Sequence, residues 1–163
     1  MTSHSEPGEG TRFADLSVGD KLPELVRGPM TPVHLMRWSS SIENWHRIHY
    51  DLPFAQGHEG LPGLLVNGSW KQHFIVQMLR EWAEPDGWLY KVTFQFRQMD
   101  VAPTTLRAWA VITGLRERGG LGYVELNLGI LNENGVESTP GRATIVLPVS
   151  STTPVPYPFS VNA

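Results

Sequence analysis

The sequence contains no cysteine among its 163 residues. This absence excludes disulfide bonds, thiolate metal sites and a cysteine nucleophile. Basic residues are not in excess either, because the formal net charge is -3, whereas a nucleic-acid-binding domain carries a basic stripe. No apolar run approaches the roughly 18 residues that a membrane-spanning helix needs. We therefore expect neither a nucleic acid nor a membrane among the partners of this protein.

The first residues, MTSHSEPGEG, lack the basic and apolar segments of a secretory signal peptide. We therefore expect a cytoplasmic protein. Hydrophobic residues make up 40% of the sequence and charged residues 18%, which is typical of a globular protein. A chain of this length can bury one substantial core, so we expect a single domain over residues 13–149.

Both ends of the chain differ from this domain in composition. Residues 1–12 are polar, and we expect a flexible N-terminus there. Residues 150–163 contain Pro154, Pro156 and Pro158, which exclude a regular helix because proline lacks a backbone N–H. We expect an extended C-terminal arm.

Turn residues divide the start of the domain into short predicted elements. Residues 21–26 form a predicted strand that ends before Gly28 and Pro29. Thr31 and the proline after it are typical of a helix start, which predicts a short helix over residues 33–42.

A long loop and a long helix follow. Residues 45–63 are polar and rich in proline and glycine, so we expect an irregular loop of the kind that often carries function. From Gly68 to Trp82, apolar residues recur at spacings of three and four. This pattern predicts a helix with a wide apolar face.

After residue 87, apolar residues alternate with polar ones, which predicts four β-strands. The alternating sets are Val92, Phe94 and Phe96; Leu106, Ala108, Ala110 and Ile112; Val124, Leu126, Leu128 and Ile130; and Ala143, Ile145 and Leu147. One sheet has to cover one very hydrophobic helix. We therefore predict an α+β fold in which an antiparallel sheet wraps around one long central helix.

Two short motifs carry the chemical signal. His49 lies in the run Asn-Trp-His-Arg-Ile-His-Tyr-Asp of residues 44–51, and Gly68 ends the run Gly-Leu-Leu-Val-Asn-Gly of residues 63–68. A histidine takes or returns a proton near neutral pH. Backbone N–H groups at a helix N-terminus hold an oxyanion. Together, the base and the N–H groups suit proton transfer next to a thioester carbonyl.

These motifs resemble those of the MaoC-like family of (R)-specific enoyl-CoA hydratases and 3-hydroxyacyl-thioester dehydratases, which have the hotdog fold. The family signature of aspartate, any residue, asparagine, proline, an aliphatic residue and histidine falls on residues 44–49. The family's valine-histidine-glycine falls on residues 66–68. The first motif is particularly similar to the mesaconyl-CoA hydratase-like branch, and residues 65–113 resemble the small subunits of heteromeric steroid-CoA hydratases.

The resemblance implies a single hotdog domain that hydrates an enoyl thioester or dehydrates a 3-hydroxyacyl thioester, with CoA as the expected carrier. It implies His49 as the acid/base, the N–H of Gly68 as the oxyanion hole, and Asn44 as the group that holds water or the leaving hydroxyl. It assigns substrate-binding positions to four further residues: Gly63, Val66, Asn67 and Arg47, the last of which would face a CoA phosphate.

The same resemblance implies that no metal and no redox cofactor takes part, since the CoA thioester is itself the substrate. Members of the family pair into dimers with the thioester channel between them. We therefore expect an acyl-CoA or acyl-carrier substrate, and either a homodimer or a heterodimer with a second MaoC-like subunit.

The chain departs from the family signature at three positions. Asn44 stands in place of the catalytic aspartate, Arg47 in place of the proline, and Val76 in place of a hydroxyl-bearing residue of the helix. An amide cannot titrate. This feature favours an alternative function, in which the chain is a non-catalytic or half-catalytic subunit that completes the acyl pocket of a heteromeric hydratase. A hotdog thioesterase is a further alternative.

Structural interpretations of the same residues stay open from sequence. His49 is also interpretable as a hydrogen-bonded loop histidine, Asn44 as a turn residue and Gly68 as a close-packing glycine. A metal site would require His46, His49, Asp51 and His58 to converge. Glu43 is a candidate substitute acid, although its side chain is expected to point away from that of Asn44.

Overall fold

The computed structural model describes residues 10–150 and 154–156. The helical elements are η1 (Phe13–Asp15), α1 (Pro32–Ser41), η2 (Arg47–His49), α2 (Leu52–Gly57) and α3 (Gly68–Ala83), where η marks a single 3-10 turn. The strands are β1 (Leu25–Met30), β2 (Trp88–Phe94), β3 (Thr104–Arg118), β4 (Leu121–Leu131) and β5 (Glu137–Pro148).

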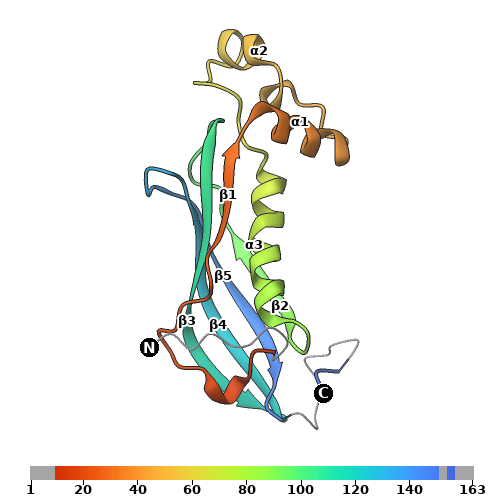
Figure 1. The fold of residues 1–163 in the computed structure, drawn as a ribbon, viewed down its shortest axis with the longest axis vertical. Coiled ribbons are helices and arrows are strands. Elements are labelled where there is room, and N and C mark those ends of the chain that lie inside the picture. The colour runs from red at the N-terminus through yellow and green to blue at the C-terminus, as the bar shows by residue number, and fades with distance from the viewer. Residues whose placement is uncertain (1–9, 151–153, 157–163) are drawn as a thin grey trace.

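The five strands form one antiparallel sheet in the order β1-β3-β4-β5-β2. The helix α3 lies along one face of this curved sheet, and α1 and α2 lie beyond the sheet, near the N-terminal end of α3 (Figure 1). The predicted antiparallel sheet around one long helix is therefore confirmed. The arrangement brings residues 44–57 to the start of α3.

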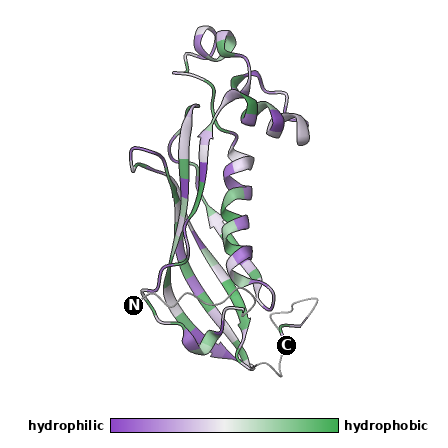
Figure 2. Ribbon diagram, in the orientation of Figure 1, coloured by the Kyte–Doolittle hydropathy of each residue, from purple (hydrophilic) through white to green (hydrophobic). Residues whose placement is uncertain are grey.

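The core lies between α3 and the sheet. Its strand residues include the predicted alternating sets of β3, β4 and β5, and α3 contributes Phe74, Ile75, Met78 and Leu79, all of them buried. Figure 2 shows apolar and polar residues alternating along the strands and around α3. Burial of these apolar side chains is the main force that holds the helix against the sheet.

The first strand differs from the prediction. Lys21 forms only an isolated bridge with Val111, and the strand runs instead from Leu25 to Met30, through Gly28 and Pro29. A Cβ on Gly28 would lie 2.6 Å from Oγ1 of Thr105, so glycine allows close approach to β3. The strand tolerates proline because β1 is at the edge of the sheet and its pairing register shifts there.

The first helix follows the prediction closely. It begins at Pro32, and Thr31 caps it together with His34 in a reciprocal capping box. Leu35 is buried, whereas Met36 is 43% exposed. The predicted irregular loop over residues 45–63 was wrong in part, because it contains η2 and α2. The side chain of Asp51 caps α2 by accepting a hydrogen bond from the N–H of Phe54. The sequence did not predict this helix, because the many prolines and glycines of the segment favour a loop.

The chain ends are only partly described. Thr11 donates a hydrogen bond of 2.6 Å to the carbonyl of Trp82 at the end of α3, and Val155 packs against Leu121, Tyr123 and Val146. The rest of the predicted flexible N-terminus and C-terminal arm lies outside the described residues. Within the described part, no helix is long and apolar enough to cross a membrane.

Candidate functional site

The start of α3 presents free backbone donors. Asn67 precedes the helix in an extended conformation, with φ of -59° and ψ of 132°, and Gly68 is the first helical residue. Within the described residues, the N–H of Gly68 has no hydrogen-bond acceptor. The positive end of the helix dipole adds to the attraction of this N–H for an anion. The N–H of Gly68 is therefore available at the positive end of α3, and its role as an oxyanion donor stays a prediction.

His49 ends the turn η2 and is buried, with 8% exposure. Its Nδ1–H donates a hydrogen bond of 2.8 Å to the carbonyl of Leu65. The proton on Nδ1 leaves a lone pair on Nε2. Burial lowers the pKa of His49 below 6.5 and the nearby His46 lowers it further, while the Leu65 hydrogen bond opposes them. The ring is thus held in the neutral, basic form.

Leu65 connects the two predicted motifs. Its N–H donates to the carbonyl of Ile48 at 3.1 Å, and its carbonyl accepts from the ring of His49. These two contacts fasten the turn η2 to a residue only three positions before Gly68. The structure therefore brings His49 and the start of α3 into one site, although sixteen residues separate His49 from Leu65 in the chain.

Ser39 of α1 connects the two asparagines of the site. Its carbonyl accepts the N–H of Asn44 at 2.9 Å, and its Oγ accepts the amide of Asn67 at 3.1 Å. Asn44 also accepts the backbone N–H of His46 through Oδ1 at 3.2 Å. Oδ1 of Asn67 is buried without a partner among the described residues. No sequence pattern predicted this role of Ser39, which resembles any polar residue near the end of a helix.

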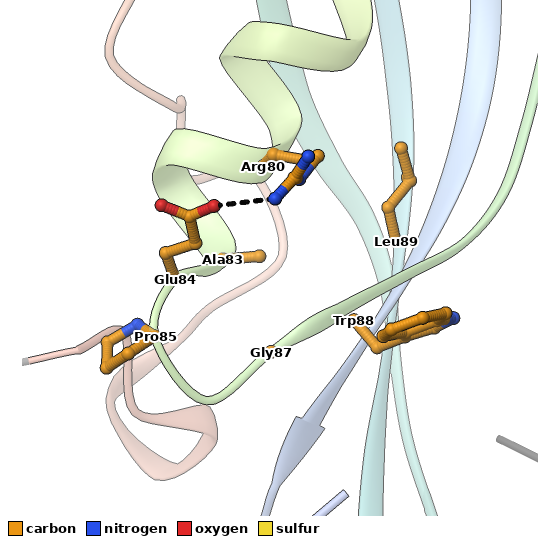
Figure 3. A pocket seen from close by; sticks show the side chains of 7 residues that line it. All are labelled: Arg80, Ala83, Glu84, Pro85, Gly87, Trp88 and Leu89. Carbon is orange, nitrogen blue, oxygen red and sulfur yellow. Dashed lines mark hydrogen bonds and ion pairs between the residues drawn. The ribbon is translucent and has the colours of Figure 1, made fainter. Parts of the chain in front are cut away.

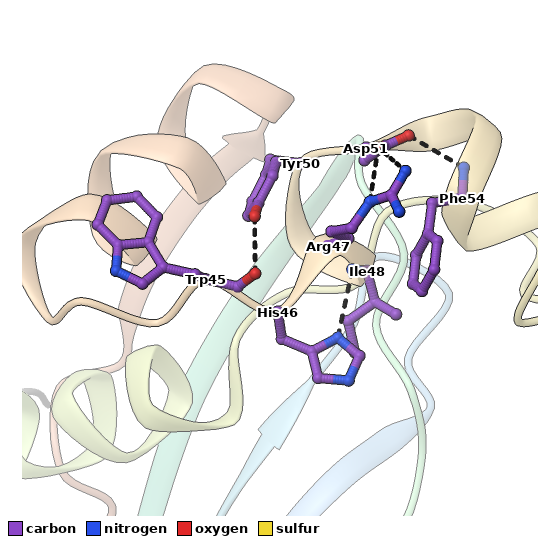
Figure 4. A network of polar contacts seen from close by, with 7 residues as sticks. All are labelled: Trp45, His46, Arg47, Ile48, Tyr50, Asp51 and Phe54. Carbon is purple, nitrogen blue, oxygen red and sulfur yellow. Dashed lines mark hydrogen bonds and ion pairs between the residues drawn. The ribbon is translucent and has the colours of Figure 1, made fainter.

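A polar network fixes the outer side of η2 (Figure 4). Nε and a terminal nitrogen of Arg47 donate to one oxygen of Asp51 at 2.9 and 2.7 Å, and the guanidinium lies 4.2 Å from the ring centre of Phe54. The hydroxyl of Tyr50 donates to the carbonyl of Trp45 at 2.7 Å. Arg47 is thus already paired within the chain, while the hydrogen bonds from Phe54 and Arg47 lower the pKa of Asp51.

Gly63 and Val66 lie on the strand-like segment that leads into α3. Leu65 bridges Val101, and Val66 donates its N–H to the carbonyl of Asp100 at 2.9 Å. A Cβ on Gly63 would lie 2.7 Å from Cγ1 of Val101. These predicted substrate-binding residues therefore shape the backbone of the site, with Gly63 allowing close approach.

A buried ion pair supports the first turn of α3. Nζ of Lys71 lies 2.8 Å from Oδ2 of Asp100, with the two side chains 3% and 0% exposed. Lys71 also donates to the carbonyl of Gln98 at 3.2 Å. Sequence reasoning missed this pair. A lysine on a helix normally reads as solvated, and no local pattern connects residues 71 and 100.

The structure does not assemble the considered metal site. His58 stacks on Phe54 with ring centres 4.8 Å apart, and Asp51 is occupied by Arg47 and the N–H of Phe54. Among residues 10–150 and 154–156, no three His, Asp or Glu side chains are arranged to hold a metal ion. Glu43 is exposed, in a left-handed conformation with φ of 53°.

Of two cavities beside α3, one is remote from this site and the other is closer to it. One of about 720 Å³ lies at the C-terminal end of α3, beside the Arg80–Glu84 ion pair (Figure 3). The sixteen residues of α3 separate it from Gly68 by about 24 Å, so we do not assign it to the site. A groove of about 370 Å³ between β1, α1 and α3 is closer. It includes Trp38, whose indole N–H donates to Ser69 at 2.9 Å.

Residues 20–104 match the family of hydroxyacyl-thioester dehydratases, type 2. Over 81 residues the chain is 41% identical to mesaconyl-C(4)-CoA hydratase of Chloroflexus aurantiacus. This alignment covers 47% of the chain and 28% of the relative, so the chain spans less than a third of that protein's length. All of the predicted site residues lie within the family match.

Solved structures show the same fold at low sequence identity. An (R)-hydratase from A. caviae involved in PHA biosynthesis has a TM-score of 0.72 and 19% identity, covering 82% of this chain and 98% of that one. A chain of the ChsH1–ChsH2 complex of Mycobacterium tuberculosis has a TM-score of 0.69 and 17% identity, covering 80% and 98%. The predicted hotdog fold is confirmed.

Proposed function

Because the chain belongs to the family of type 2 hydroxyacyl-thioester dehydratases, we propose that it hydrates an enoyl thioester or dehydrates the corresponding 3-hydroxyacyl thioester. The observation that carries the proposal is the state of His49. Its Nδ1–H is held by Leu65, which is three residues before Gly68, and its Nε2 is left as a base. A base and an oxyanion donor on one connected loop are the two groups that this reaction uses.

In the hydration direction, Nε2 of His49 takes a proton from water while the water oxygen bonds to C3 of the enoyl thioester. The electrons of the double bond move towards the thioester carbonyl, whose oxygen accepts the N–H of Gly68. The protonated ring of His49 then returns the proton to C2. A single titratable side chain, that of His49, therefore accepts and returns the proton that hydration transfers. The reaction needs no second titratable group, so an asparagine at position 44 is compatible with it. Dehydration is the reverse.

The remaining residues have supporting roles in this proposal. Asn44 accepts the backbone N–H of His46 through Oδ1 and so positions the turn that carries His49. Gly63, Val66 and Asn67 shape the backbone against which the thioester lies, and Arg47 holds the turn through Asp51. A CoA phosphate would have to share Arg47 with Asp51, so we assign Arg47 first to the turn.

We propose a CoA thioester as substrate, with no metal or redox cofactor, and a location in the cytoplasm. The relative's name makes mesaconyl-C(4)-CoA the first compound to test. The groove beside Ser69 supports an acyl group that carries its own carboxylate. Arg27, Arg37 and His73 are among its lining residues, and none of the described residues that line it is acidic. Arginine suits carboxylate recognition through its planar fork of donors.

The test is incubation of the purified chain with mesaconyl-C(4)-CoA, with monocarboxylic short and branched enoyl-CoAs and with steroid-like enoyl-CoAs, followed by mass spectrometry. We expect products that have gained one water and keep the CoA. Release of free thiol would instead indicate the thioesterase alternative. A thioester that gains no water with any acyl group would contradict a self-sufficient hydratase.

One observation favours a second candidate function, that of a subunit in a heteromeric hydratase. Asn44 does not titrate, and one similar structure is the complex of two proteins, ChsH1 and ChsH2. In this case the chain completes the acyl pocket of a partner. Co-expression with a second MaoC-like chain encoded nearby would distinguish the two functions, because only the heteromer would then hydrate the thioester.

A further inference from the structure

The turn that carries His49 also carries a second imidazole. His46 is the residue before η2 and His49 is its last residue, so they are three positions apart. A 3-10 turn has three residues per turn, which places such positions on one side. The two ring centres lie 6.2 Å apart with their planes at 62°. His46 is exposed whereas His49 is buried.

The two rings are engaged through their Nδ1 atoms in opposite ways. Nδ1 of His49 donates to the carbonyl of Leu65 at 2.8 Å, whereas Nδ1 of His46 accepts the N–H of Ile48 at 3.4 Å. A neutral imidazole has one N–H and one lone pair. His49 therefore has its lone pair on Nε2, and His46 has its proton on Nε2. At their Nε2 atoms, the two rings therefore offer one hydrogen-bond acceptor, on His49, and one hydrogen-bond donor, on His46.

The water oxygen that adds to C3 of the enoyl thioester requires one hydrogen-bond acceptor and one hydrogen-bond donor. It must give a proton to a base, and a hydrogen bond donated to one of its lone pairs orients the other lone pair towards carbon. Two hydrogen bonds of about 2.8 Å through one oxygen join nitrogens that are up to roughly 5.6 Å apart. The ring nitrogens lie on the edges of the two rings, whose centres are 6.2 Å apart, so rings at this separation leave room for one bridging oxygen. We propose that His46 is a catalytic residue whose Nε2–H holds the reacting oxygen against His49. This inference rests on the proposed hydration of an enoyl thioester.

The neighbouring polar groups are already occupied. Asp51 is bound by Arg47 and by the N–H of Phe54, and Oδ1 of Asn44 accepts the backbone N–H of His46. The nearby His46 also lowers the pKa of His49. Asn44 is then a positioning residue as well, because its contact with the backbone of His46 orients the turn.

The test compares His46→Leu, which lacks a donor, with His46→Gln, whose amide nitrogen can reach the position of Nε2. We expect His46→Leu to lower kcat for hydration about 100-fold, as the loss of a preorganised donor does, with a smaller change in KM. His46→Gln should recover most of this loss. The matched control is His58→Leu, a histidine of the same region that stacks on Phe54 and should leave kcat unchanged.

Two further measurements keep the test decisive. Urea unfolding of His46→Leu separates a folding defect from a catalytic one. Long-range ¹H–¹⁵N spectra of the wild type should show His49 with its proton on Nδ1 and His46 with its proton on Nε2. The Nδ1–H form of His46, or a folded His46→Leu variant as fast as wild type, would overturn this inference alone. Absence of turnover by the wild-type chain would overturn the proposed function, and the inference with it.

Discussion

The role that we propose for His49 depends on one backbone contact and on burial. The carbonyl of Leu65 fixes the proton on Nδ1, and burial keeps the ring neutral by lowering its pKa. The sequence motifs drew attention to His49 and Gly68, because both lie in short contiguous runs, and the structure connects the two runs through Leu65. Leu65 and Ser39 were beyond prediction, since their roles arise only when α1 and the loop meet at the start of α3.

The pH dependence of hydration follows from this environment. Since the pKa of His49 is lowered, the basic form prevails at neutral pH and is lost only when the pH falls below 6.5. We expect kcat/KM to be flat from pH 7 to 8 and to decline on the acid side through an apparent pKa below 6.5. Initial rates between pH 5 and pH 8 provide the measurement. An apparent pKa above 7 would contradict the account.

Gly68 allows the oxyanion donor to be deleted with little change to the backbone. Proline is tolerated at the first position of a helix, and Asn67 already has the extended φ and ψ that a residue before proline requires. Gly68→Pro therefore removes the N–H and adds the atoms of the proline ring, while the backbone conformation is kept. A Cβ at residue 68 would lie 2.9 Å from Phe96, whose side chain is exposed.

We expect Gly68→Pro to lower kcat about 100-fold relative to Gly68→Ala, which adds the Cβ but keeps the N–H. Steady-state kinetics of the two variants, with far-UV circular dichroism as a check on folding, give the comparison. Equal kcat values would remove Gly68 from the catalytic machinery.

Among the elements, α3 depends on a contact that its own sequence does not reveal. Its apolar face was predictable because Phe74, Ile75, Met78 and Leu79 repeat at helical spacing and are buried. A period of two likewise predicted the buried sets of β3, β4 and β5, whereas Phe96, predicted as part of a strand, lies beyond the end of β2 and is exposed. Lys71 was not predictable, because its partner Asp100 lies 29 residues away and periodicity describes only one element at a time. The position of strand β1 was predicted wrongly for a similar reason. Its pairing with β3 continues the strand through Pro29, where the sequence predicted an end.

The buried pair supports a prediction on stability. Removal of Lys71 leaves Asp100 buried and uncompensated, which costs about 3–5 kcal/mol in comparable cases. We expect Lys71→Met to lower the free energy of unfolding by this amount, as measured by urea denaturation. The double variant Lys71→Met with Asp100→Leu should recover most of the loss, because it removes both charges. A Lys71→Met variant as stable as wild type would contradict a structural role for the pair.

Among the described residues, the sheet has two edge strands, β1 and β2. An edge strand is a natural place for pairing with another chain, and we expect the protein to form a dimer. Light scattering coupled to gel filtration should give twice the chain mass of 18.2 kDa. If the enzyme works as a homodimer, specific activity should fall on dilution as the dimer dissociates. A monomer that is fully active would contradict this expectation.

We propose that His49 makes this single chain a hydratase. The most direct measurement is the absorbance of the enoyl-thioester band when purified chain is added to mesaconyl-C(4)-CoA, beside the His49→Asn variant. Asparagine can keep the hydrogen bond to Leu65 but supplies no base. We predict loss of the band with wild type and a rate at least about 100-fold lower with His49→Asn. Equal rates for the two proteins would contradict the account.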